Sequence, residues 1–215
     1  FYSYNAGGEF HSGTENKISV YGTDEWKVSD NFNLSYGLHL RNHTVNGEFS
    51  LTPRTVGFNF TDASQFDKIN KSFYQIAGSF NATYNISKNF GVIANFLYTE
   101  ENRRLESYSQ AFEPNTNKIK SPLGAFGIFW NTNFIQLISQ ATYLKKNNNL
   151  ERFNLVNPAN TSQAQNTTVY YDIQTLGWTT DFVLTPFKGF NLHYLITFQN
   201  PVYKKFNFDA FGTAY

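Results

Sequence analysis

The sequence predicts an all-β protein, an antiparallel transmembrane β-barrel with eight clear strands in four hairpins. Three observations carry this prediction: apolar and polar residues alternate along short segments, these segments occur in pairs joined by tight turns, and long polar connections separate the pairs. Successive side chains of a strand point to opposite faces, so each alternating segment describes a strand with an apolar medium on one side and a polar medium on the other.

The segment SDNFNLSYGLHLR, residues 29–41, shows the alternation most clearly. From Phe32 to Leu40 its even positions are all aromatic or aliphatic, whereas the odd positions between them are polar or glycine. A short polar turn followed by Phe and another strand-like run returns at residues 87–98, 131–144 and 187–198. A second run of strand type precedes each turn, and turns of roughly three to five residues join the two runs. The four predicted hairpins are about 16–42, 72–100, 118–147 and 168–200.

The connections between the hairpins are long, rich in Asn, Ser, Thr, Gln and charge, and without a helical period; they are residues 43–71, 101–117 and 148–167. Tight turns at one end and long polar loops at the other are typical of a bacterial outer-membrane barrel, with turns in the periplasm and loops outside. Aromatic residues gather near the turns, as they do at a membrane–water boundary. The predicted lipid-facing and girdle residues are Trp26, Phe32, Phe90, Trp130, Phe134, Trp178 and Phe190.

The opposite face of the predicted strands should line a wet lumen. The lumen-facing candidates for substrate contact are Asn33, Ser35, His39, Arg41, His43, Asn81, Asn95 and His193. Four residues of strand separate His39 from His43 by about 13 Å, too far for both to bind one metal ion. The hairpin 118–147 fits the two-face rule less well, because its apolar residues fall at odd positions after Phe134. A bulge or a one-residue phase change would explain this misfit.

The connection 101–117 supplies candidates outside the membrane: Arg103, Arg104, Tyr108 and Phe112. Basic and aromatic side chains together suit an anionic or carbohydrate-like ligand. A plain solvated loop is the interpretation that we favour for this segment.

Composition excludes several classes of protein. A formal net charge of +1 gives no electrostatic sign of a nucleic-acid partner. No run approaches about 18 apolar residues, so the sequence excludes a transmembrane helix and leaves a barrel as the route to the membrane. The chain has no cysteine, hence no disulfide framework and no thiol nucleophile. No hydrolase, nucleotide or calcium motif is present, so we expect no enzyme, no metal and no cofactor.

Three other interpretations stay open. The strands of a soluble β-sandwich or lectin-like module also alternate apolar and polar residues. Here every second connection is long while the others are tight, and aromatic residues lie near the tight ones, which favours the barrel. A self-contained barrel of about eight to ten strands would be an adhesin or a structural protein. An outer-membrane hydrolase would use His39 or His193 with a nearby serine.

Chain direction predicts that the sheet is part of a larger barrel. If the tight turns mark the periplasm, the first clear strand, 18–26, runs toward the periplasm and the last, 190–200, runs away from it. Both ends of the segment would then lie outside the cell, whereas a barrel inserted from the periplasm should keep both ends on the inner side. We therefore expect further strands before residue 15 and after residue 200.

The segment VYGTDEWKVSDNFNLSYGLHLR, residues 20–41, resembles the strand–turn–strand element of TonB-dependent outer-membrane receptors. The shared features are an acidic-aromatic pair before a short turn, followed by a strand that carries Gly37 and Arg41. Residues 73–101 and 175–201 are similar to later hairpins of that family. The abundance of Asn, Phe and Tyr is similar to members from the Bacteroidota.

This resemblance implies a barrel of about 22 strands that a plug domain occludes. Residues 1–215 would be part of the barrel domain, and the sequence contains no plug. The resemblance implies a location in the outer membrane, contact with its lipid, and import of an iron chelate or siderophore. It also implies an energy-coupling TonB-type partner that acts through the plug. Importers of a glycan, a peptide or cobalamin belong to the same family and stay open, so the substrate is a small-molecule or oligomeric nutrient.

Overall fold

The structure, a computed structural model, describes residues 10–50, 66–109, 115–157, 159–161, 164–206, 209–210 and 213–214. Its main element is one antiparallel sheet of eight strands that neighbour each other in chain order. The strands are β1 (His11–Lys27), β2 (Phe32–Ser50), β3 (Phe66–Asn85), β4 (Phe90–Glu101), β5 (Ile119–Asn131), β6 (Ile135–Val156), β7 (Ala164–Leu184) and β8 (Leu192–Lys204). A short helix, α1 (Leu105–Ser109), and a small ladder of β9 (Asp209–Ala210) with β10 (Thr213–Ala214) complete the described elements.

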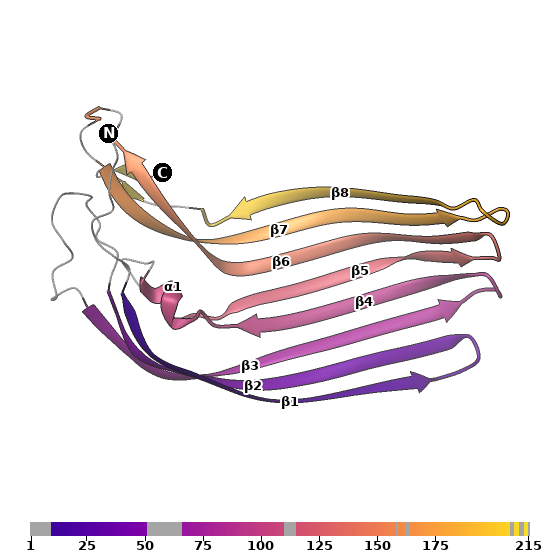
Figure 1. The fold of residues 1–215 in the computed structure, drawn as a ribbon, viewed down its shortest axis with the longest axis horizontal. Coiled ribbons are helices and arrows are strands. Elements are labelled where there is room, and N and C mark those ends of the chain that lie inside the picture. The colour runs from indigo at the N-terminus through magenta and orange to yellow at the C-terminus, as the bar shows by residue number, and fades with distance from the viewer. Residues whose placement is uncertain are drawn as a thin grey trace.

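The predicted fold class is confirmed, with eight strands in four hairpins. Tight turns lie at one end of the sheet and long connections at the other (Figure 1). Within the described ranges, β1 and β8 do not pair with each other, so the sheet is open. No helix in this part of the chain is long and apolar enough to cross a membrane.

The sheet has two chemically different faces, because side chains directly opposite in an antiparallel pair point to the same side. Leu34 in β2 stands opposite Trp26 in β1 and Ala82 in β3, and this face is called the outer face. Its large exposed side chains include Val20, Tyr36, Leu38, Leu40, Ile76, Phe80, Tyr84, Phe96, Phe126, Ile128, Trp130, Tyr143, Leu176, Trp178, Tyr194, Ile196 and Phe198. The opposite face, called the inner face, is mostly polar or small, with interruptions such as Leu97 and Phe129.

The hairpin that fitted the two-face rule poorly obeys it in the structure. Trp130 stands opposite Leu137, and Phe126 stands opposite Ala141, without a bulge in this pairing. The turn at residues 132–134 therefore joins even positions of β5 to odd positions of β6 on one face. A register shift does occur in β6, but it lies farther along, between Lys146 and Asn149. The phase change is thus a consequence of turn length.

Two groups of strands continue well beyond the length that a membrane requires. β2 and β3 have 19 and 20 residues, and β6 and β7 have 22 and 21, whereas a transmembrane strand needs about 9 to 11. The turn-distal parts of β1, β2 and β3, residues 11–17, 43–50 and 66–73, are called the first extension. Those of β6 and β7, residues 145–156 and 164–174, are called the second extension. In Figure 1 both lie at the end with the long connections. The predicted loops 43–71 and 148–167 were therefore wrong in their bounds, because strand pairing reaches Ser50, Phe66, Val156 and Ala164.

The connection 101–117 is not a solvated loop throughout, and it contains α1, which the sequence did not predict. α1 packs on the inner face of the first extension, where Leu105 lies over the opposed pair Gly13 and Gly47. A Cβ atom on either glycine would collide with neighbouring atoms, so the close approach requires glycine there. The buried apolar cluster consists of Val45, Phe49, Ile69, Phe73, Leu105 and Tyr108. The apolar residues that β2 and β3 carry on the inner face of the first extension are therefore explained by this cover.

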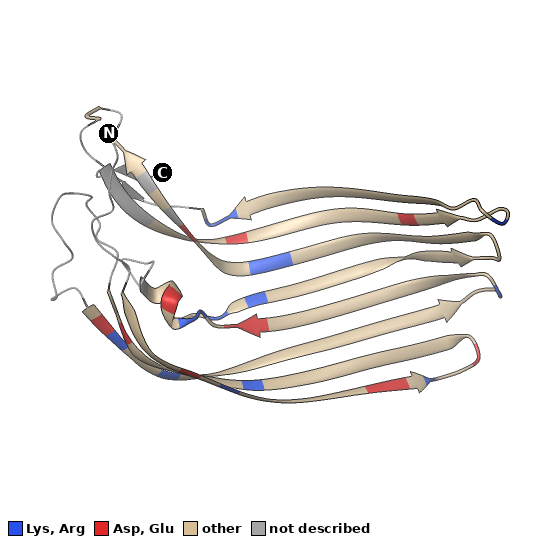
Figure 2. Ribbon diagram, viewed as in Figure 1, with Lys and Arg blue, Asp and Glu red and all other residues tan. Residues whose placement is uncertain are grey.

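Charged side chains are sparse along the middle of the strands and gather toward both ends of the sheet (Figure 2). Asp24 is an acidic residue on the outer face, and its carboxylate accepts a hydrogen bond of 2.9 Å from the Tyr36 hydroxyl. It lies next to the turn between β1 and β2, where the charge stays near water.

Candidate functional site

The polar candidates nearest the tight turns form one part of the inner wall. Ser35, Asn81 and Asn95 stand opposite each other across β2, β3 and β4, and the Asn81 amide donates to the Ser35 hydroxyl at 3.3 Å. With Asn33, Ser35 and Asn81 line a cavity of about 390 Å³. Its other lining residues are Glu25, Trp26, Lys27, Leu34 and Thr83. Polar donors and acceptors from three strands thus meet in one shallow site.

His39 and Arg41 occupy the next inner positions of β2 toward the long connections. The His39 ring meets Tyr21 edge to face, with ring centroids 6.5 Å apart. His39 also lines a smaller cavity of about 200 Å³ that reaches across β1, β2, β3 and β4. Arg41 is half-buried and lies one inner position beyond His39.

His193 lies on β8, several strands away from His39. Its Nε2 atom is 2.7 Å from Oδ1 of Asp181, and both side chains are exposed on the inner face. The partner of His193 is thus a carboxylate and not a serine hydroxyl. Among the residues that the structure describes, no group of three His, Asp or Glu side chains lies close enough to hold a metal ion.

His43, predicted to face the lumen, lies on the inner face but is covered there. Its side chain is buried in the first extension, with Nδ1 2.9 Å from Asn102 Oδ1 and Nε2 3.0 Å from Glu15 Oε2. Each ring nitrogen therefore lies within hydrogen-bond distance of a side-chain oxygen. Asn102 also accepts from Gln75 and donates to the carbonyl oxygen of Arg103 at 3.0 Å. His43 thus ties the connection 101–117 to the sheet.

Glu15 in β1 completes this attachment. Its Oε1 atom accepts a hydrogen bond of 2.7 Å from the backbone N–H of Leu105, the first residue of α1. Burial raises the pKa of Glu15, but the hydrogen bonds from Leu105 and His43 and the charges of His43 and Lys17 outweigh it. The pKa of this carboxyl therefore lies below its usual range, and the ionised form holds the start of the helix.

Arg103 attaches the same connection to the second extension. Its guanidinium donates to the carbonyl oxygens of Asn115 at 3.0 Å, Asn117 at 3.3 Å and Asn148. The guanidinium also lies over the Tyr170 ring, 5.0 Å from its centroid. Only 5% of Arg103 is exposed, so the solvated-loop interpretation is wrong for this residue.

Asn148 is the residue of the second extension that accepts a hydrogen bond from Arg103. It sits in the register shift of β6 with φ of 57°, a left-handed conformation that asparagine tolerates better than most residues. Its backbone N–H donates to Asp172 at 2.9 Å, and its side-chain amide donates to the Asn117 carbonyl at 2.8 Å. The bulge therefore presents a carbonyl oxygen to Arg103.

The remaining candidates of this connection differ in their exposure. Arg104 is exposed, whereas Tyr108 is 1% exposed and its ring centroid lies 5.5 Å from that of Phe49. Burial raises the pKa of Tyr108 to about 12. Phe112 lies outside the described residues.

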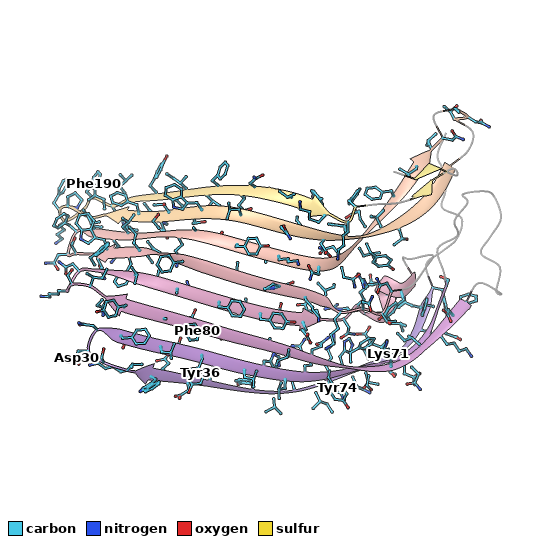
Figure 3. The ribbon with its side chains drawn as sticks, turned by 180° about the vertical axis from the view of Figure 1, so that it is seen from behind. Asp30, Tyr36, Lys71, Tyr74, Phe80 and Phe190 are labelled. Carbon is cyan, nitrogen blue, oxygen red and sulfur yellow. The ribbon has the colours of Figure 1, made fainter. Side chains whose placement is uncertain are left out.

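The predicted lipid-facing aromatic residues lie away from this network. Trp26, Trp130, Phe134, Trp178 and Phe190 are exposed, and Phe32 and Phe90 are half-buried. The Trp178 indole N–H donates to Ser139 Oγ at 2.8 Å, so a polar group on the outer face has a partner. Figure 3 labels Tyr36, Phe80 and Phe190, which belong to the same set of outward or turn-proximal aromatic residues.

Two of the solved structures that resemble this chain belong to transport proteins. The copper transporter OprC has a TM-score of 0.63 at 12% identity, with 85% of this chain and 29% of that chain covered. The ferric-catecholate import receptor Fiu from E. coli K12, in a closed form, has a TM-score of 0.65 at 15% identity, with 90% and 29% covered. No family model and no curated protein matches the sequence.

At such identities the likeness concerns the fold. The open sheet matches barrel segments of TonB-dependent receptors, and the chain spans about three tenths of the length of each of these two proteins.

Proposed function

We propose that this chain is part of the barrel wall of a TonB-dependent receptor in the bacterial outer membrane, which imports a nutrient such as an iron chelate. The observation that carries this proposal is the division of one eight-stranded sheet into an apolar outer face and a polar inner face. Lipid would cover the first face, and the second would line the path of the substrate.

The edges of the sheet support a larger barrel. β1 and β8 are the two edge strands of the sheet, and every residue of both is exposed. Within the described part of the chain, neither strand pairs with another strand along its free edge. Unpaired N–H and C=O groups cost several kcal/mol each in lipid, roughly, so a membrane sheet must close. Further strands, to about 22 in all, would close it in this family. Residues 1–215 would then be one part of the barrel domain.

The inner face supports a role in substrate passage. Asn33, Ser35 and Asn81 offer hydrogen-bond donors and acceptors beside a cavity, and Arg41 adds a positive charge farther along the same strand. The described parts of the connection, residues 101–109 and 115–117, contact both extensions and would narrow the outer entrance. A plug and a TonB-type energy-coupling protein would complete the importer.

The test uses the full-length protein that carries this chain. It should be extracted from membranes only with detergent, and cells that express it should accumulate a radiolabelled ferric chelate under iron limitation. Uptake should stop when the coupling protein is deleted or the proton gradient is collapsed. A protein that leaves the membrane fraction without detergent, or chelate uptake that is unchanged after deletion of the gene, would contradict the proposal.

A further inference from the structure

An aromatic pocket lies on the inner face where the second extension meets the end of β8. Phe153 in β6, Tyr171 in β7, Tyr203 in β8 and Phe206 after β8 line it together with Glu151. The pocket has a volume of about 390 Å³. That volume is within the range of sites for small molecules, which are about 300 to 1,000 Å³ and mostly apolar with few polar groups.

The four rings form one contiguous cluster around Phe206. Its ring centroid is 5.8 Å from Phe153, 5.5 Å from Tyr171 and 6.0 Å from Tyr203. Tyr171 and Tyr203 are 5.4 Å apart. Edge and tilted contacts of this kind are the arrangements that aromatic pairs prefer.

A turn directly after β8 brings Phe206 into this cluster. Lys205 has a φ of 57°, a conformation uncommon for residues other than glycine, and its Nζ atom is 3.1 Å from Asp172. The ion pair and the backbone turn together place the next residue, Phe206, over the rings of the two tyrosines. The cluster is thus assembled from three strands and an anchored turn.

The charges around the pocket are divided between the two faces of the sheet. Glu151 is the charged residue among those that line the pocket. Burial raises the pKa of Asp172. The hydrogen bond from the Asn148 backbone N–H and the interactions with Lys205 and Lys145 outweigh burial, so the pKa of Asp172 lies below its usual range. Asp172 and Lys145 occupy outer-face positions, because Asp172 adjoins the inner-face residue Tyr171 and Lys145 pairs with Gln174. The pocket itself is therefore aromatic and acidic.

We propose that this aromatic pocket binds a small organic cation with a compact apolar body, such as a quaternary ammonium group. A cation over an aromatic ring is attracted by the negative ring face, and the attraction increases when the ligand loses water. The Glu151 carboxylate adds a charge of the opposite sign, and the rings supply apolar contact for the methyl groups. This site does not depend on the transport function proposed above.

The test compares two ligands of nearly the same shape. Choline carries the quaternary ammonium group, and 3,3-dimethyl-1-butanol replaces its nitrogen with carbon and is neutral. Binding of each to the full-length protein in maltoside micelles is measured by calorimetry or by saturation-transfer NMR. We expect saturable binding of choline, and binding of the neutral analogue weaker by at least about tenfold. Absence of saturable choline binding, or equal binding of the two ligands, would overturn the proposal.

Variants locate the site. Glu151→Gln keeps the size of the side chain and should weaken choline binding about tenfold while the neutral analogue is unaffected. Tyr203→Leu should weaken both ligands, because it removes a ring face. Glu48→Gln, a change at an exposed carboxylate of the first extension, is the matched control and should leave choline binding unchanged. Unchanged choline affinity in Glu151→Gln, or an equal loss in Glu48→Gln, would show that the cation binds elsewhere.

Discussion

Replacement of Arg103 by alanine should release the connection 101–117 from the second extension. Arg103 is buried and donates to three backbone carbonyl groups. Its removal takes this donor from the carbonyl oxygens of Asn115 and Asn148, whereas the Asn117 oxygen keeps the Asn148 side-chain amide. Hydrogen bonds to a charged group contribute about 1.5 to 3 kcal/mol each, and the Tyr170 ring adds about 0.5 to 1 kcal/mol. The gross loss is therefore roughly 5 to 10 kcal/mol.

Burial of the guanidinium is itself unfavourable and offsets much of the stabilisation that these contacts provide. Taking a charge out of water costs several kcal/mol, so we expect a net loss of about 3 kcal/mol in the free energy of local opening. Since about 1.4 kcal/mol is a factor of ten, backbone amides of residues 102–118 should exchange with deuterium about 100 times faster in Arg103→Ala. Amides in the middle of β2 and β3 should keep their protection.

The control is the neighbouring arginine. Arg104 is exposed, so Arg104→Ala should change exchange in the same peptides by less than about threefold. Hydrogen exchange with mass spectrometry on the protein in micelles resolves this difference. Equal protection of residues 102–118 in Arg103→Ala and the parent protein, or equal loss in Arg104→Ala, would refute the assigned role of Arg103.

Three further predictions concern the helix, its acidic anchor and the outer face. Leu105→Ala should destabilise the buried cluster by about 2 to 4 kcal/mol, read as faster proteolysis of this connection; unchanged cleavage would contradict the packing. Because the pKa of Glu15 is lowered, its stabilising effect is present above the ordinary carboxyl pKa and lost as pH falls through the lowered value. A spin label replacing Arg104 should therefore become mobile in acid, and Glu15→Gln should remove that dependence. In the proposed barrel, Trp178 lies about six residues from the turn and, with strands tilted by about 45°, roughly 14 Å into the membrane. Trp178→Arg should therefore cost about 2 to 4 kcal/mol of unfolding free energy in urea, whereas the inner-face control Thr179→Arg should cost about 0 to 1 kcal/mol.

The strands and their faces were predictable from sequence because their period is local. A residue such as Leu38 reveals its face through its immediate neighbours alone, and the fold prediction built on that pattern is confirmed. The assignment of Asn33 or Asn81 to substrate contact stays a prediction, since the structure gives their position and not their ligand.

The buried network was not predictable in the same way. Glu15 and His43 meet because β1 and β2 pair in one register, and Asn102 joins them from the connection after β4. No local period in the sequence reports either arrangement. The sequence shows that Arg103 is charged but not that it is buried, because its hydrogen-bond acceptors are backbone carbonyl groups, which every residue carries. The aromatic pocket was missed because Phe153 lies in a segment whose Asn-rich composition concealed a strand.

The turn at residues 132–134 has a consequence for how this chain tolerates insertions and deletions. Its length puts Trp130 opposite Leu137, and a single added residue would instead turn Gln136 and Gln140 toward the apolar side. Two added residues would restore the original sides with a longer turn. Length variants at this turn should accordingly survive in steps of two, and homologous sequences should differ there by even numbers of residues.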